Sequence, residues 1–333
     1  MNSKDLTKAN YIFILFFMKR NIYTKNDAGN TFLLCILSPQ VIGTLFVLLL
    51  LFYAFFTKTS YEELTKNSVV IFLMTILSQI IFIGIFFFYN KFFKINSKNA
   101  CKANFKIGAL NYIISIIIGL ICLFGFNGIT NCFSKLIEII LKHTPAEMPL
   151  PLNNGWWLLA NLIFLALLPA IFEELIFRGM ILNGLKQYGK IKAVIISALL
   201  FALIHGSIDQ TLYPIILGLI FGMVAIKTNS IIPTILMHFI NNSVVIIINY
   251  IYTIKGITET VAVDTAYVLI SLAVAIAAGL IIFGLSFLLK NKTQPQVEEY
   301  DLQYFEMAKS KPNTCMTIGV IIGVLIWILA LFV

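Results

Sequence analysis

The stretch "PAIFEELIFRGM", from Pro169 to Met180, places two adjacent glutamates and an arginine inside an apolar segment. The ten residues before it are apolar apart from Asn161. A charge at the centre of a membrane helix costs ~2.5–3.5 kcal/mol, so three charges in one span need partners or a function. The stretch therefore predicts a transmembrane helix that carries a buried polar site.

The composition places this helix in a polytopic membrane protein. Of the 333 residues, 59% are hydrophobic and only 12% are charged, whereas soluble domains carry about 25% charged residues. Apolar runs recur at about 32–56, 69–89, 107–126, 156–177, 191–204, 212–226, 231–250, 264–289 and 315–333. We predict an all-α protein with about nine transmembrane helices and a buried intramembrane site. The runs 191–204 and 212–226 are short for the ~20 residues that a span needs.

The basic residues indicate a lipid partner and an orientation. The net charge of +9 comes from lysines and arginines that gather between the apolar runs, where a membrane protein meets anionic lipid, so nucleic acid is not an expected partner. The more basic connections alternate with the less basic ones, beginning with the N-terminal segment. We predict a multi-pass protein of the cell membrane with a cytoplasmic N-terminus and an extracytoplasmic C-terminus at Val333.

The three charges of the opening stretch are not equivalent. Glu174 and Arg178 are spaced i, i+4 with the acid first, which is the favourable order for an ion pair within one helix. Glu173 points about 100° away around the helix and has no partner of its own there. A structural ion-pair network that locks helices together would explain the pair. It would not explain the third carboxyl group, so Glu173 is a functional candidate.

Two histidines fall in the same third of the chain. His205 ends the apolar run "VIISALLFALIH", and His238 lies inside "IIPTILMHFINN" with Asn242 one turn later. Glu173 lies 16 residues before the polar break at Gly189, and His205 lies 16 residues after it. When two helices leave the same turn, residues at equal sequence distance from the turn lie at equal depth, here ~24 Å along the helix axis. We therefore expect Glu173, His205, His238 and Asn242 to converge in one layer.

Such a constellation can hydrolyse an amide bond without a covalent intermediate. A carboxylate and an imidazole that share a water form a general base, and a second imidazole with an amide N–H can stabilise an oxyanion. The sequence has no His-Glu-x-x-His and no Gly-x-Ser-x-Gly motif, which disfavours the usual zinc-protease helix and the serine elbow. No aspartate lies deep in an apolar run, which argues against a two-aspartate protease.

The region of about 155–250 resembles the CPBP family of CAAX-protease and bacteriocin-processing membrane proteins, also called the Abi family, and its type II CAAX prenyl endopeptidases. The motifs that carry the resemblance are Glu173-Glu174-x-x-x-Arg178, Phe201-x-x-x-His205, His238-x-x-x-Asn242 and the series Pro214, Gly218 and Gly222. The resemblance implies that Glu173 and His205 activate water, and that His238 and Asn242 stabilise the oxyanion. It also implies an intramembrane endopeptidase whose substrate is a peptide or a membrane protein.

The resemblance suggests three regions along the chain. Residues 151–250 would form the catalytic helix bundle. Residues 1–150 would form an N-terminal membrane region with about three spans and an amphipathic segment. Residues 251–333 would add two spans and a charged loop. A prenylated protein, a peptide precursor and a membrane-protein fragment all remain open as substrates.

Alternatives follow from the same residues. Glu173, His205 and His238 could bind zinc as a two-His, one-carboxylate site. A zinc peptidase would still need a general base, and Glu174 is committed to Arg178, so we favour a mechanism without a metal cofactor. A non-proteolytic immunity or secretion-partner protein on the same scaffold is a second possibility. A proton-coupled transporter is a third, but it would need polar groups along a path on both sides of the membrane.

Overall fold

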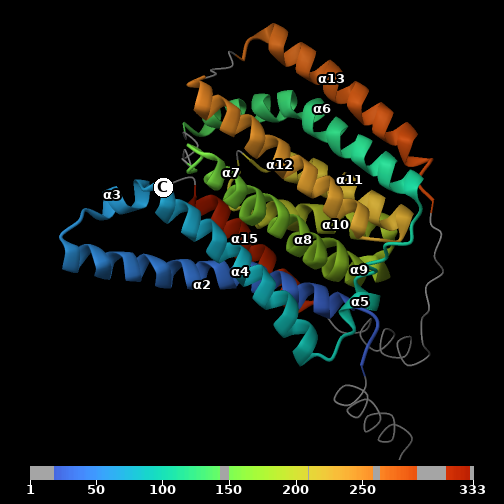
Figure 1. The fold of residues 1–333 in the computed structure, drawn as a ribbon. Helices are drawn as coiled ribbons and strands as arrows, with labels where there is room; N and C mark the ends of the chain where they lie inside the picture. Colours follow the sequence, from blue (N-terminus) through green and yellow to red (C-terminus); the bar gives the residue numbers. More distant parts are fainter. Residues whose placement is uncertain (1–18, 143–149, 209, 258–262, 291–312, 331–333) are drawn as a thin grey trace, which may run out of the picture.

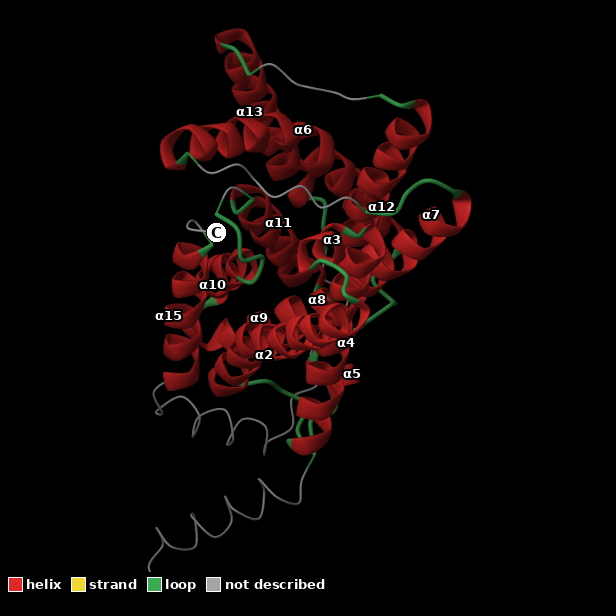
Figure 2. Ribbon diagram, turned by 90° about the vertical axis from the view of Figure 1, so that its left-hand side faces the viewer, coloured by secondary structure: helices red, strands yellow, loops and turns green. Residues whose placement is uncertain are grey.

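The computed structural model describes residues 19–142, 150–208, 210–257, 263–290 and 313–330. This part of the chain is helical, and Figure 2 shows helices joined by loops. The helices before the central segment are α2 (Lys25–Thr57), α3 (Tyr61–Lys66), α4 (Ser68–Phe92), α5 (Ser97–Ala100) and α6 (Ala109–Leu141). The helices after it are α10 (Lys190–Leu203), α11 (Leu212–Thr228), α12 (Ile232–Lys255), α13 (Thr265–Ser286) and α15 (Thr314–Leu329).

One irregular helical segment, Gly155–Tyr188, occupies the middle of the bundle. Two π-helical turns and a 3-10 turn interrupt its α-helical parts. Its successive parts are α7 (Gly155–Asn161), η1 (Leu162–Leu167), α8 (Leu168–Glu174), η2 (Leu175–Ile181), α9 (Leu182–Leu185) and η3 (Lys186–Tyr188). The stretch that opened the sequence analysis therefore forms the end of α8 and most of η2.

The prediction of an all-α polytopic membrane protein is confirmed, but the number of nine spans is not. Each predicted run falls on a helix, and six helical segments of the described chain are long and apolar enough to cross a membrane. The helices α10, α11 and α15 have 14, 17 and 16 residues. These three are shorter than the ~20 residues of a full span.

Local sequence signals set several helix ends. Thr24 and Asp27 form a capping box at the start of α2, and the Asn154 side chain accepts from the backbone N–H of Trp157 at the start of α7. Such caps satisfy backbone donors that the helix itself leaves unpaired. At the end of α12, Gly256 adopts the left-handed conformation that terminates a helix.

The bundle has two main apolar clusters with the central segment between them. One cluster joins α2, α4, η2, α9 and α10, and the other joins α6, α11, α12 and α13. Figure 1 shows α6 and α13 on one side of the central segment and α2, α4 and α15 on the other. The region where these two clusters face each other holds the candidate site.

The short helices α10 and α11 are held together by unusually close contact. A Cβ atom at Gly218 would lie 2.7 Å from Ala198 Cα, and one at Gly222 would lie 3.0 Å from a methyl group of Val194. Small residues allow helix backbones to approach in membranes, where packing rather than the hydrophobic effect drives association. The glycines of the sequence motif are therefore explained by the contact between α10 and α11.

We expect Gly218→Ala to destabilise the protein by ~1–3 kcal/mol, the usual cost of overpacking, because the new methyl group meets backbone atoms of α10. Thermal unfolding of the detergent-solubilised protein would measure the loss. Gly279→Ala in α13 is the control, because no atom lies within 4 Å of its added Cβ. An unfolding midpoint for Gly218→Ala equal to that of the control would contradict the packing argument.

The orientation in the membrane remains a prediction from the lysine pattern. We expect a cysteine at Asn99, in α5, to be protected from an impermeant thiol reagent in intact cells. A cysteine at Ser60, beside α3, should react under the same conditions. Both positions are exposed, and the five native cysteines would first be replaced. The reverse labelling pattern would overturn the charge-based orientation.

Candidate active site

The π-helical turns flank the glutamate pair on both sides. η1 ends two residues before Pro169, and η2 begins at the residue after Glu174. Pro169 has no N–H, so the Leu165 carbonyl lacks the donor that an α-helix supplies from four residues on. The Asn242 side chain of α12 donates to this carbonyl at 3.2 Å. The irregular backbone thus gives α12 a polar contact with the central segment next to the glutamates.

Glu174 forms the buried ion pair that the sequence predicts. Its Oε1 atom lies 2.6 Å from Arg178 Nη1, and both side chains are enclosed, with exposures of 0% and 1%. The guanidinium also lies 4.5 Å from the centre of the Phe201 ring and 5.3 Å from that of Phe221. Cation–π contacts of this kind stabilise a desolvated cation further.

Glu174 has a second partner that the sequence analysis did not identify. Nδ1 of His238 lies 3.0 Å from the same Oε1 atom of Glu174. A carboxylate can only accept, so Nδ1 carries the hydrogen and the ring is fixed with Nε2 on its other side. Glu174 therefore positions His238 and neutralises Arg178 at once.

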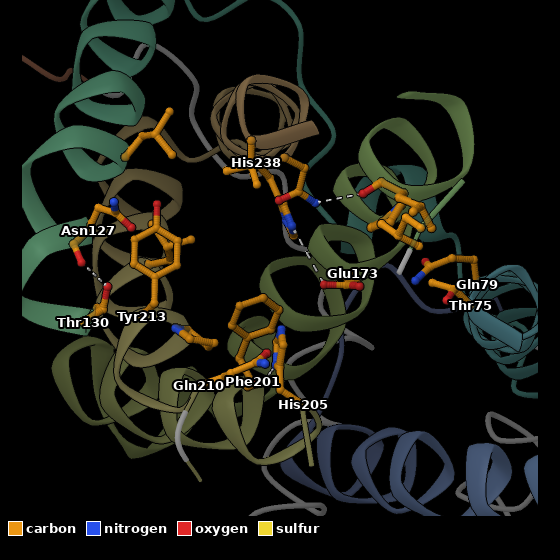
Figure 3. Close-up of a pocket in the computed structure, with 18 of the residues that line it drawn as sticks. Thr75, Gln79, Asn127, Thr130, Glu173, Phe201, His205, Gln210, Tyr213 and His238 are labelled. Atoms are coloured by element: carbon orange, nitrogen blue, oxygen red, sulfur yellow. Dashed lines mark hydrogen bonds and ion pairs between the residues drawn. The ribbon is translucent and has the colours of Figure 1, made fainter. Parts of the chain in front are cut away.

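Within the described residues, Glu173 has no hydrogen-bonded partner of this kind. Its Oε2 atom lies 3.9 Å from Nε2 of His238. The residue is 9% exposed, and its carboxylate lines a cavity of about 570 Å³. Figure 3 shows His238 and Glu173 facing each other at the centre of this cavity.

His205 follows the end of α10 and also lines the cavity. Its Nδ1 atom lies 2.8 Å from the Phe201 carbonyl oxygen. Because a carbonyl oxygen only accepts, Nδ1 must carry a hydrogen, which leaves Nε2 of the neutral ring as an acceptor. His205 is more exposed than Glu173 and His238. Of the two histidines that line the cavity, it is therefore the one that water reaches more easily.

The structure brings all four candidate residues to one cavity. Asn242 lines it together with Glu173, His205 and His238. The hydrogen bond to Leu165 uses one of the two N–H groups of the Asn242 amide, so the other remains available. The cavity volume is within the range of ~300–1,000 Å³ that is usual for ligand pockets.

The donor set of the alternative zinc site is not assembled. In the part of the chain that the structure describes, no group of three His, Cys, Asp or Glu side chains is placed to hold a metal ion. Zinc needs its nitrogen and oxygen ligands at ~2.0–2.2 Å from one point.

The fold and the cavity define a polytopic helical membrane protein with a Glu, His, His and Asn site among its helices. Residues 155–244 match the family model described as "Type II CAAX prenyl endopeptidase Rce1-like". Over this segment the chain is similar to the CPBP family, which confirms the resemblance seen in the sequence. Neither the curated proteins nor the solved structures compared with the chain gave a match.

The cavity also has walls that the motif analysis missed. Thr75 and Gln79 come from α4, and Asn127 and Thr130 come from α6, outside the matched segment. Figure 3 shows these two pairs on opposite sides of Glu173. In the sequence, only the polar residues that interrupt the apolar run 69–89 could have indicated the α4 wall of the cavity. The sequence does not show that they face the site.

We expect Glu174→Gln to cost about 3–5 kcal/mol of stability, since it leaves the buried guanidinium of Arg178 uncompensated. The double variant Glu174→Gln/Arg178→Met should recover much of the loss, because it removes the stranded charge. Thermal unfolding in detergent would measure both. Glu62→Gln is a matched control: it breaks an i, i+4 pair with Lys66 of the same 2.6 Å length that is exposed on α3, so no measurable change is expected.

A single variant as stable as the wild type would contradict the role of this pair. So would a double variant that is no more stable than the single one.

Proposed function

We propose that this protein is an intramembrane endopeptidase that hydrolyses a peptide bond of a membrane-associated peptide or protein. The main support is the convergence of Glu173, His205, His238 and Asn242 on one cavity, inside a segment that matches a family of CAAX prenyl endopeptidases. The three regions expected from the sequence fit this proposal, with the site in the middle region and further cavity walls from the N-terminal one.

In the proposed reaction, a water binds between the Glu173 carboxylate and Nε2 of His205. Glu173 takes a proton from this water as the oxygen attacks the substrate carbonyl carbon. The enclosed position of Glu173 limits competing water, which strengthens its interaction with the attacking molecule. His205 accepts the second hydrogen bond of the water and so fixes the direction of attack.

The carbonyl oxygen becomes an oxyanion that needs donors on its other side. His238 can donate from Nε2 when its ring is protonated. Asn242 supplies an amide N–H. When the C–N bond breaks, the proton held by Glu173 passes to the leaving nitrogen. The products are a carboxylic acid and an amine, and no covalent enzyme intermediate forms.

We expect Glu173→Gln to lower the rate of peptide cleavage about 10²–10⁴-fold, the usual contribution of a general base. Its thermal stability should stay close to that of the wild type, because among the described residues Glu173 has no ion partner at hydrogen-bonding distance. The measurement is cleavage of a synthetic peptide library by the purified protein in lipid vesicles, read by mass spectrometry. Wild-type cleavage by the variant would refute the assignment of Glu173 as the base.

The same assay separates a metal-free reaction from a zinc-dependent one. Prolonged exposure of the active protein to a membrane-permeant chelator should leave the rate unchanged. Activity that is lost on chelation and restored by zinc would instead assign Glu173, His205 and His238 as metal ligands.

A further inference from the structure

Gln79 is an unusual residue for the membrane interior. It lies in α4, is 6% exposed, and its Oε1 atom is enclosed without any hydrogen-bond partner. A buried amide oxygen without a partner costs free energy, and apolar side chains occupy most of the neighbouring positions of α4. No contact within the described chain explains why an amide is kept at this position.

Gln79 lines the same cavity as the proposed catalytic residues. Three hydroxyl groups of the cavity walls are bonded within the protein: Thr75 donates to the Ile71 carbonyl, Thr130 to the Asn127 carbonyl, and Tyr213 to Asn241. Among the described residues that line the cavity, Gln79 is the one with an enclosed, unpaired side-chain atom. Gln79 is therefore a buried amide with an unused acceptor, in the wall of the cavity where a substrate would bind.

We propose that Gln79 is a substrate-positioning residue, whose side-chain oxygen accepts a hydrogen bond from a backbone N–H of the substrate beside the bond to be cleaved. This inference rests on the proposed endopeptidase function. It adds a residue from α4, outside the segment that matches the family model.

The geometry also indicates the conformation of the substrate. Gln79 lies to one side of Glu173 and the α6 groups lie to the other (Figure 3), so a segment bound over Glu173 passes Gln79. In a helical substrate the backbone N–H groups are occupied by its own carbonyls. Only an unwound, extended segment can offer an N–H to Gln79. The substrate class is therefore a peptide segment that is extended on the Gln79 side of the cleaved bond.

The test uses Gln79→Leu, which keeps a similar side-chain volume and removes the amide. The probe is a fluorogenic peptide chosen from the synthetic library because the wild type cleaves it and Glu173→Gln does not. A set of its derivatives carries a single N-methyl group at each backbone nitrogen in turn, which removes one N–H at a time. Ser78→Ala is the control, since its neighbouring hydroxyl donates to the Thr75 carbonyl and is not part of the cavity wall.

For the wild type, we expect one N-methyl position near the cleaved bond to lower kcat/KM by about tenfold, as for the loss of one hydrogen bond. Gln79→Leu should lower kcat/KM about tenfold on the unmethylated peptide. For this variant, the N-methyl group at that sensitive position should cause no further decrease in kcat/KM. Its thermal stability should equal or exceed that of the wild type, because no intramolecular hydrogen bond is lost. Ser78→Ala should behave as the wild type throughout.

Two results would overturn the inference while leaving the proposed function intact. One is wild-type kcat/KM for Gln79→Leu. The other is a reduced rate for Gln79→Leu with the N-methyl pattern of the wild type unchanged, which would indicate a purely structural role. A library in which Glu173→Gln cuts as well as the wild type, or in which nothing is cut, would contradict the proposed function and this inference together.

Discussion

The positive charge of Arg178, enclosed among apolar helices, is the constraint on which the site depends. Its only charged partner at hydrogen-bonding distance in the described chain is Glu174, at 2.6 Å, and a lone cation there would be costly. The Phe201 and Phe221 rings from α10 and α11 contact the guanidinium. His238 from α12 bonds the same carboxylate. The Glu174–Arg178 pair of the central segment therefore contacts three further helices, α10, α11 and α12, at the level of the cavity.

The cavity is lined by residues of both main apolar clusters, including Phe201 of one and Leu217 of the other. At Gly218 the short helices α10 and α11 approach to backbone contact. At Gly119 the longer helices α6 and α12 are in ordinary van der Waals contact, through Met237. Between the clusters, the walls remain apart and carry neutral polar groups next to the ionisable ones.

The matched segment alone does not enclose the site. Residues 155–244 contain all six charged and polar residues of the motif, but α4 and α6 complete the cavity. This division suggests that the chemistry belongs to the central helices and that selection of the substrate belongs to the helices around them. The proposed role of Gln79 is one instance of that division.

The sequence by itself determined the helical membrane class, the positions of the apolar helices and the Glu174–Arg178 pair. Each of these depends on composition or on spacing within one helix, which the chain fixes locally. Only the tertiary structure decided that His238, 64 residues away, binds Glu174. It also decided that Gln79 faces the cavity, because α4 is apolar around most of its surface and periodicity cannot indicate which face turns inward. Contacts between distant helices depend on how the bundle packs, and the local pattern does not encode that packing.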